Sequence, residues 1–230
     1  MDHSVSARKC ITAMMIPALI IAVMELIENI LCYQNGMPVP AAITGYLRSY
    51  FILHQFVYIC VLAGCFPLAW LMFIESGIPL RSAITSIRKF IPDLAFGLIA
   101  GTITFAISYF MYHIVMGIPL VKSSGSIIIL RVVSLTLFSG FFKEILFRGI
   151  PFIFLKNQIG EFPAFMCGNI LFAVLDWPNM GISFIYGTIW YLFYRKRGSL
   201  LVPVTAHGFH NLMQTLAVSG GLAFIGIIPH

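Results

Sequence analysis

Residues Ser139–Gly149 read Ser-Gly-Phe-Phe-Lys-Glu-Ile-Leu-Phe-Arg-Gly and place three ionisable side chains inside a long apolar run. A charged side chain at bilayer depth costs about 2.5–3.5 kcal/mol on insertion scales, so such residues are usually retained for a reason. Glu144 and Arg148 share a helix face with the acid on the N-terminal side, which is the better order for an ion pair. Lys143 lies roughly 100° around the helix and needs a partner on another helix.

The composition excludes an ordinary soluble domain. Of the 230 residues, 60% are apolar and 10% are charged, whereas a soluble domain averages about 25% charged residues. Long apolar runs recur along the whole chain, which predicts an all-α, polytopic helical membrane protein. The five cysteines lie in or beside these runs without the spacing of metal ligands. The net charge of +6 comes from basic loops, and nothing indicates a nucleic-acid partner.

The apolar runs predict about seven transmembrane helices in a single membrane domain. The expected spans are residues 11–33, 47–73, 92–116, 127–156, 162–176, 181–194 and 200–218. Residues 1–126 would carry the three N-terminal helices, 127–219 a core of four helices, and 220–230 a short apolar tail. Basic residues concentrate in loops on one side, which predicts a cytoplasmic N-terminus and an outside C-terminus. The short loops would suit a bacterial cytoplasmic membrane.

Acidic residues also occur in the fifth span and in the first span. Asp176 ends the fifth span, where the helix macrodipole disfavours a negative charge, so it needs a cation such as Lys143. Glu25 and Glu28 share a face of the first span. They would form a proton or cation site, make a packing contact to Lys143 or Arg131, or be protonated acids.

The last span contains a polar set that can do chemistry. His207 and Asn211 face the same way, and His210 partly shares their face. Such a pair can bind a water, orient a carboxylate or donate to an oxyanion, or it can cross-link helices by hydrogen bonds. Together with Asp176 and Glu144 the histidines have ligand types that suit zinc. The same groups can satisfy one another, so we expect neither a metal nor another cofactor.

Three motifs in order carry a family resemblance. They read Lys143-Glu144-x-x-x-Arg148, Phe172-x-x-x-Asp176 and His207-x-x-x-Asn211. The chain thereby resembles, over residues 139–212, the CPBP family of intramembrane endopeptidases, which includes the CAAX prenyl proteases and the bacteriocin-processing Abi group. That family carries Glu-Glu-x-x-x-Arg, Phe-x-x-x-His and His-x-x-x-Asn in the same order. The resemblance implies a CAAX-protease-like helical bundle.

The resemblance also implies roles for individual residues. In the family, the first glutamate of the pair and the histidine of the second motif activate a water. This water attacks a peptide bond near a prenylated C-terminus or in another membrane-associated substrate. By resemblance, His207 and Asn211 take the positions that stabilise the oxyanion, and Glu144 is a catalytic-site carboxylate. Arg148 and Phe172 take structural positions.

The two water-activating positions depart from the family, because they hold Lys143 and Asp176. A general base must accept a proton, and an ammonium has no lone pair to do so. We expect a Lys143–Asp176 ion pair and a degenerate protease that acts as a binding, scaffold or regulatory module for a membrane protein or a lipidated peptide. The alternative is an active endopeptidase with an altered centre, with Glu144 as base or with a Ser139–Lys143 nucleophile pair. At about 1.5 Å of rise per residue, His207 comes out shallower than Lys143, so tilt or an irregular start to the last span must close that gap.

Overall fold

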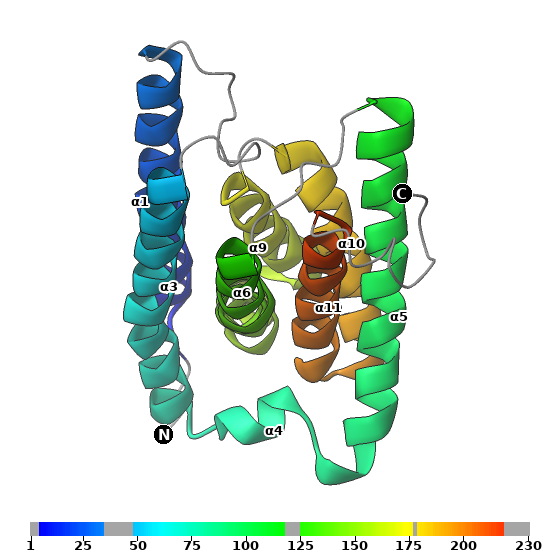
Figure 1. Ribbon diagram of the computed structural model, residues 1–230. Helices are drawn as coiled ribbons and strands as arrows, with labels where there is room; N and C mark the ends of the chain where they lie inside the picture. The colour runs from blue at the N-terminus through cyan, green and yellow to red at the C-terminus, as the bar shows by residue number, and fades with distance from the viewer. Residues whose placement is uncertain (1–4, 35–47, 118–124, 177–178, 219–230) are drawn as a thin grey trace.

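A computed structural model describes residues 5–34, 48–117, 125–176 and 179–218, which form helices and their connections without a strand (Figure 1). The predicted all-α bundle is confirmed. The long elements are α1 (Ala7–Gln34), α3 (Arg48–Ser76), α5 (Phe90–Tyr109) with η2 (Phe110–Val115), α9 (Glu161–Val174), α10 (Met180–Arg197) and α11 (Leu201–Val218). The short α4 (Leu80–Ile84) and η1 (Ile87–Lys89) connect α3 to α5.

The seventh long segment, which we call helix 125–159, carries the charged stretch. It runs without a break through α6 (Gly125–Arg131), η3 (Val132–Ser139), α7 (Gly140–Glu144), η4 (Ile145–Gly149), η5 (Pro151–Leu155) and α8 (Lys156–Ile159). The three η segments in it are π-helical. Such turns are rare and concentrate at functional sites.

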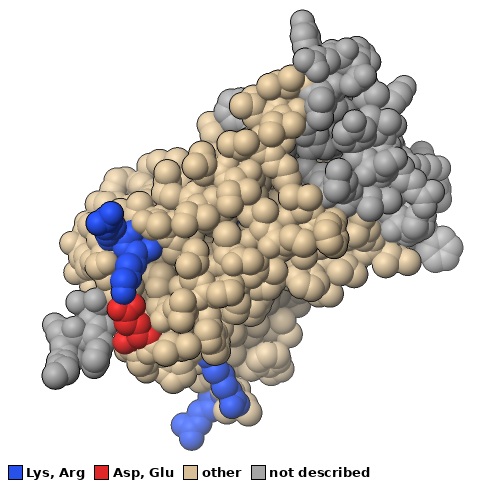
Figure 2. All heavy atoms as spheres, turned by 90° about the vertical axis from the view of Figure 1, so that its left-hand side faces the viewer, with Lys and Arg blue, Asp and Glu red and all other residues tan. Residues whose placement is uncertain are grey.

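The surface fits a lipid environment. Three stretches are each long and apolar enough to cross a membrane, namely Ala7–Met24, Phe56–Ser76 and Leu80–Val115. Large apolar side chains point outward along them, for example Leu19 and Leu71, which are 62% and 58% exposed. Figure 2 shows charged side chains gathered at one end of the face that it draws, next to a broad uncharged surface. The chain is an integral membrane protein.

Basic loops that are distant in sequence meet at one end of the bundle. Arg197 forms a salt bridge to Asp93, with 2.8 Å between Nη2 and Oδ1. The Ser199 hydroxyl donates to the carbonyl of Ile84 at 2.6 Å. These contacts join the end of α10 and the α10–α11 connection to α4 and to the start of α5, so the basic residues near both lie on the same side. The predicted orientation of the two termini stays a prediction.

Glycines let α11 pack closely between two neighbours, as Figure 1 shows for α11 between α5 and α6. A Cβ atom at Gly101 of α5 would lie 2.7 Å from the carbonyl oxygen of Ala206. A Cβ atom at Gly140 of α7 would lie 3.1 Å from the backbone nitrogen of Gly208. Small residues allow such backbone contacts in membrane bundles. The close packing brings the polar residues of α11 next to those of helix 125–159.

Candidate functional site

The centre of the bundle is a buried carboxylate with two partners. Oε1 of Glu144 accepts a hydrogen bond from Arg148 Nη1 at 2.9 Å. Nδ1 of His207 lies 2.7 Å from the same oxygen. Glu144 is 0% exposed, and Arg148 and His207 are 2% and 4% exposed. The expected Glu144–Arg148 ion pair is therefore present, and both of its side chains are buried inside the bundle.

His207 lies deeper than the count of residues predicted, since it touches Glu144 directly. Its ring stacks on Trp190, with centroids 4.7 Å apart and planes at 26°. The Phe172 ring meets it edge-on at 5.6 Å. The depth gap given by a count along straight α-helices is therefore closed in the structure. The π-helical turns of helix 125–159 place more residues in each turn and shorten its rise.

Phe172 separates and supports the cations of the centre. The guanidinium carbon of Arg148 lies 3.8 Å from the centroid of the Phe172 ring. The Lys143 ammonium lies 5.3 Å from the same centroid and 5.2 Å from the centroid of Tyr58. These distances allow cation–π attraction. Lys143 is 6% exposed, so its ammonium lies in an aromatic environment contributed by α3 and α9.

The predicted Lys143–Asp176 ion pair is wrong. Among the described residues, the salt bridges do not include this pair. Asp176 instead accepts hydrogen bonds from the Ser183 hydroxyl and, at 3.1 Å, from Asn179 Nδ2. Asp176 precedes α10, whose N-terminal dipole favours a carboxylate. Local donors therefore satisfy it, although opposite charge alone suggested a partner on helix 125–159.

Asn211 cross-links α11 to helix 125–159. Its Nδ2 donates to the carbonyl oxygen of Leu135 at 2.7 Å. Leu135 lies in the π-helical segment η3. The amide thus holds the two elements together and lies one turn from His207 on the same face. Whether it donates to an oxyanion stays a prediction that the resemblance carries.

His210 faces away from the carboxylate centre. Its Nδ1 lies 3.1 Å from Thr104 Oγ1 on α5, and Trp190 Nε1 donates to the same hydroxyl oxygen at 3.2 Å. Among the described residues, no three His, Cys, Asp or Glu side chains lie close enough to hold a metal ion. The side chains of Glu25 and Glu28 lie outside the described residues.

Two residues that position the Arg148 side chain, Asn169 and Gly187, were not singled out from the sequence. Nη2 of Arg148 donates to Asn169 Oδ1 at 3.4 Å, and Asn169 Nδ2 donates to the Phe184 carbonyl at 3.0 Å and to Thr188 Oγ1 at 3.1 Å. A Cβ atom at Gly187 would lie 1.9 Å from Asn169 Oδ1. The signal was a lone amide three residues before Phe172, which therefore shares its helix face.

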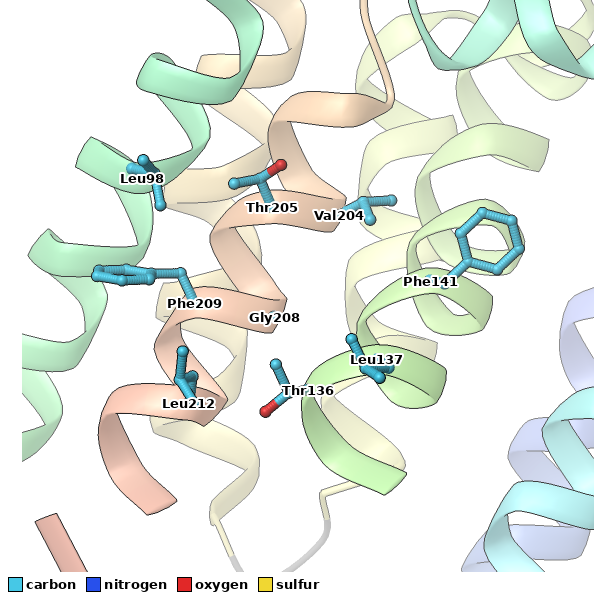
Figure 3. Close-up of a pocket in the computed structure, with 9 residues that line it drawn as sticks. All are labelled: Leu98, Thr136, Leu137, Phe141, Val204, Thr205, Gly208, Phe209 and Leu212. Atoms are coloured by element: carbon cyan, nitrogen blue, oxygen red, sulfur yellow. The ribbon is translucent and has the colours of Figure 1, made fainter. Parts of the chain in front are cut away.

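A groove runs along α11 next to this centre. It encloses about 450 Å³ and is mostly apolar. Figure 3 shows its lining side chains arriving from α5, from helix 125–159 and from α11, around Gly208. Thr136 Oγ1 on its wall is buried without a hydrogen-bond partner among the described residues. Gly208 follows His207 directly, so the groove and the carboxylate centre share a turn of α11.

These features define an integral membrane protein built around a buried Glu–Arg–His centre. Residues 125–213 match the model of a protein family described as "Type II CAAX prenyl endopeptidase Rce1-like". This part of the chain, from α6 into α11, resembles that family, so the expected family resemblance is confirmed. A search of curated proteins and a search of solved structures gave no match.

Proposed function

We propose that this protein is a degenerate CAAX-protease-like membrane protein that binds a membrane partner and does not hydrolyse it. One observation carries the proposal: Lys143 and Asp176 stand at the two positions where the family resemblance expects the water-activating glutamate and histidine. An ammonium cannot accept a proton. The family's water-activating pair is therefore absent from this sequence.

The contacts of the two residues support this proposal. Lys143 lies against the rings of Tyr58 and Phe172. Asp176 is held by Ser183 and Asn179. The remaining carboxylate of the centre, Glu144, already accepts hydrogen bonds on Oε1. These partners hold one oxygen of the carboxylate in place within the bundle.

A second function rests on a different atom. Oε2 of Glu144 is buried and has no hydrogen-bond partner among the described residues. This oxygen would serve as the general base of an altered hydrolytic centre, with His207 and Asn211 stabilising the oxyanion. The substrate would then be a membrane-associated or prenylated peptide.

The partner that we propose is a membrane protein or a lipidated peptide. The proposed location is a bacterial cytoplasmic membrane, with the N-terminus inside and the C-terminus outside. The loops that join at the Asp93–Arg197 salt bridge support one basic side, as the positive-inside rule requires. We keep 127–219 as the boundaries of the core and 1–126 as the N-terminal helices.

The test is peptide cleavage by the purified protein in detergent, with a panel of prenylated and unmodified peptides. We expect no cleavage by the wild type and a gain of cleavage in the Lys143→Glu/Asp176→His double variant. Lys156→Glu, a charge reversal at an exposed site of the same helix, is the matched control and should gain nothing. Wild-type cleavage that both Glu144→Ala and His207→Ala abolish would establish the second function instead.

A further inference from the structure

Two adjacent residues of α7 each bury a polar group without a hydrogen-bonding partner. Among the described residues, no salt bridge and no hydrogen bond involves the Lys143 ammonium, whose contacts are the rings of Tyr58 and Phe172. Lys143 is nevertheless 94% buried, since 6% of it is exposed. Oε2 of Glu144, which is fully buried, likewise lacks a partner.

Burying each of these two polar groups without a hydrogen-bonding partner costs free energy. Buried charges in proteins are paired or bind a ligand, and buried acceptors are hydrogen-bonded. Cation–π attraction from two rings offsets part of the desolvation of an ammonium, and it supplies no acceptor for the three N–H groups. Lys143 therefore needs an oxygen acceptor, and Glu144 Oε2 needs a donor.

Lys143 and the Arg148 partner of Glu144 border the same aromatic ring. Phe172 has Lys143 at 5.3 Å and Arg148 at 3.8 Å from its centroid. Arg148 in turn lies 2.9 Å from Glu144. Lys143 is also close enough to Glu144 for a Coulombic interaction. One small polar group beside this ring would meet both needs.

A carboxylic acid has the required chemistry. Its carbonyl oxygen accepts from an ammonium, and its O–H donates to a carboxylate, so a single group supplies one acceptor and one donor. In its neutral form it also enters the bilayer interior at lower cost than an ionised headgroup, because desolvation penalises charge. A phosphate carries a charge at neutral pH and lacks this advantage.

We propose that Lys143 and Glu144 form a binding site for the carboxyl group of a long-chain fatty acid that reaches the centre from the bilayer. The carbonyl oxygen accepts from the Lys143 ammonium, and the acid O–H donates to Glu144 Oε2, so the two carboxyl groups share one proton. The assignment rests on the proposed binding role of this centre and specifies its ligand. It depends on Lys143, which the family's pattern does not have at this position.

The experiment is equilibrium binding of tritiated oleate to the full chain in nanodiscs. We expect saturable binding to the wild type and a loss of about tenfold or more in affinity for Lys143→Met, which keeps the length of the side chain but removes the charge-assisted hydrogen bond. Lys143→Arg should retain most of the affinity. Lys156→Met is the control, because Lys156 also lies over a ring, 5.8 Å from Phe152, but is exposed. It should bind oleate like the wild type.

Competition binding to the wild type tests which group of the ligand is recognised and needs no variant. The proposal therefore stays testable even if Lys143→Met folds poorly. Unlabelled oleate should compete, whereas methyl oleate, which keeps the carbonyl oxygen but lacks the O–H that donates to Glu144 Oε2, should not. Equal competition by the methyl ester, or undiminished binding to folded Lys143→Met, would overturn the proposal. Stronger competition by an apolar peptide with a free C-terminus would overturn the fatty-acid assignment. Cleavage of peptides by the wild type would refute the degenerate function but would leave the oleate result standing as a separate test.

Discussion

Gly187→Ala tests the network that the sequence did not reveal. The added Cβ would lie 1.9 Å from Asn169 Oδ1 and 2.5 Å from Arg148 Nη2, so at least one of these groups must move. Asn169 is a short side chain with hydrogen bonds to Phe184 and Thr188, and Arg148 is held by Glu144. Neither side chain can therefore move away from the added Cβ atom without losing a hydrogen bond or a salt bridge.

The magnitude follows from the contacts that must break. Losing the two hydrogen bonds from Asn169 Nδ2 and the one from Arg148 costs about 1 kcal/mol each. Overpacking adds about 1–3 kcal/mol, and alanine returns up to about 1 kcal/mol of helix propensity. We therefore expect Gly187→Ala to lower the free energy of unfolding by about 3–5 kcal/mol. For a chain of this size, that is a fall of roughly 6–20 °C in the unfolding midpoint.

Thermal unfolding of the purified protein in detergent, followed by tryptophan fluorescence, measures this fall. The matched control is Gly181→Ala on the same helix, where an added Cβ meets nothing within 4 Å. The control should unfold at the wild-type temperature or slightly above it. Each kcal/mol of lost stability lowers the unfolding midpoint of a chain of this size by roughly 2–4 °C. If the midpoint of Gly187→Ala lies within about 2 °C of the midpoint of the control, the reasoning is refuted.

Two further predictions concern charges. Because Lys143 and Asp176 do not form a salt bridge, a double-mutant cycle with Lys143→Met and Asp176→Asn should be additive within about 0.5 kcal/mol; a coupling well above that would restore the ion pair. Asp93→Asn should destabilise the protein by about 1.5–3 kcal/mol, since it weakens the charge-assisted hydrogen bond between the buried acid and the partly exposed Arg197. Chemical denaturation compares it with Glu75→Gln, an acid in an exposed pair worth about 0–1 kcal/mol, and equal effects would contradict the prediction.

Features that depend on neighbours in sequence were predictable. The helices follow the apolar runs closely, so that the span expected at 200–218 is α11 (Leu201–Val218). The Glu144–Arg148 pair follows from a spacing of one helical turn. In each case, the periodicity of the helix fixes the geometry without knowledge of the packing.

Features that depend on packing between helices were not predictable. The opposite charges of Lys143 and Asp176 suggested an ion pair, but charge alone does not say which way a side chain points. In the structure, Asp176 accepts hydrogen bonds from Asn179 and Ser183, at the start of α10. The support of Arg148 by Asn169 requires Gly187 on a third helix. The π-helical turns that bring Glu144 to the level of His207 have no pattern in the residues that we could recognise.

The residues that hold the centre of the bundle together differ from the residues at the two positions that activate a water in the family. Glu144, Arg148 and His207 are buried and contact one another, so replacing one of them leaves an unpaired group in the core and costs folding energy. Lys143 and Asp176 lie outside this mutual set, since rings surround one and local donors bind the other. Changes at these two positions therefore leave the buried network intact. Under the degenerate function that we propose, this arrangement explains how the chain keeps the fold of the family that it resembles while Lys143 and Asp176 stand at the two water-activating positions.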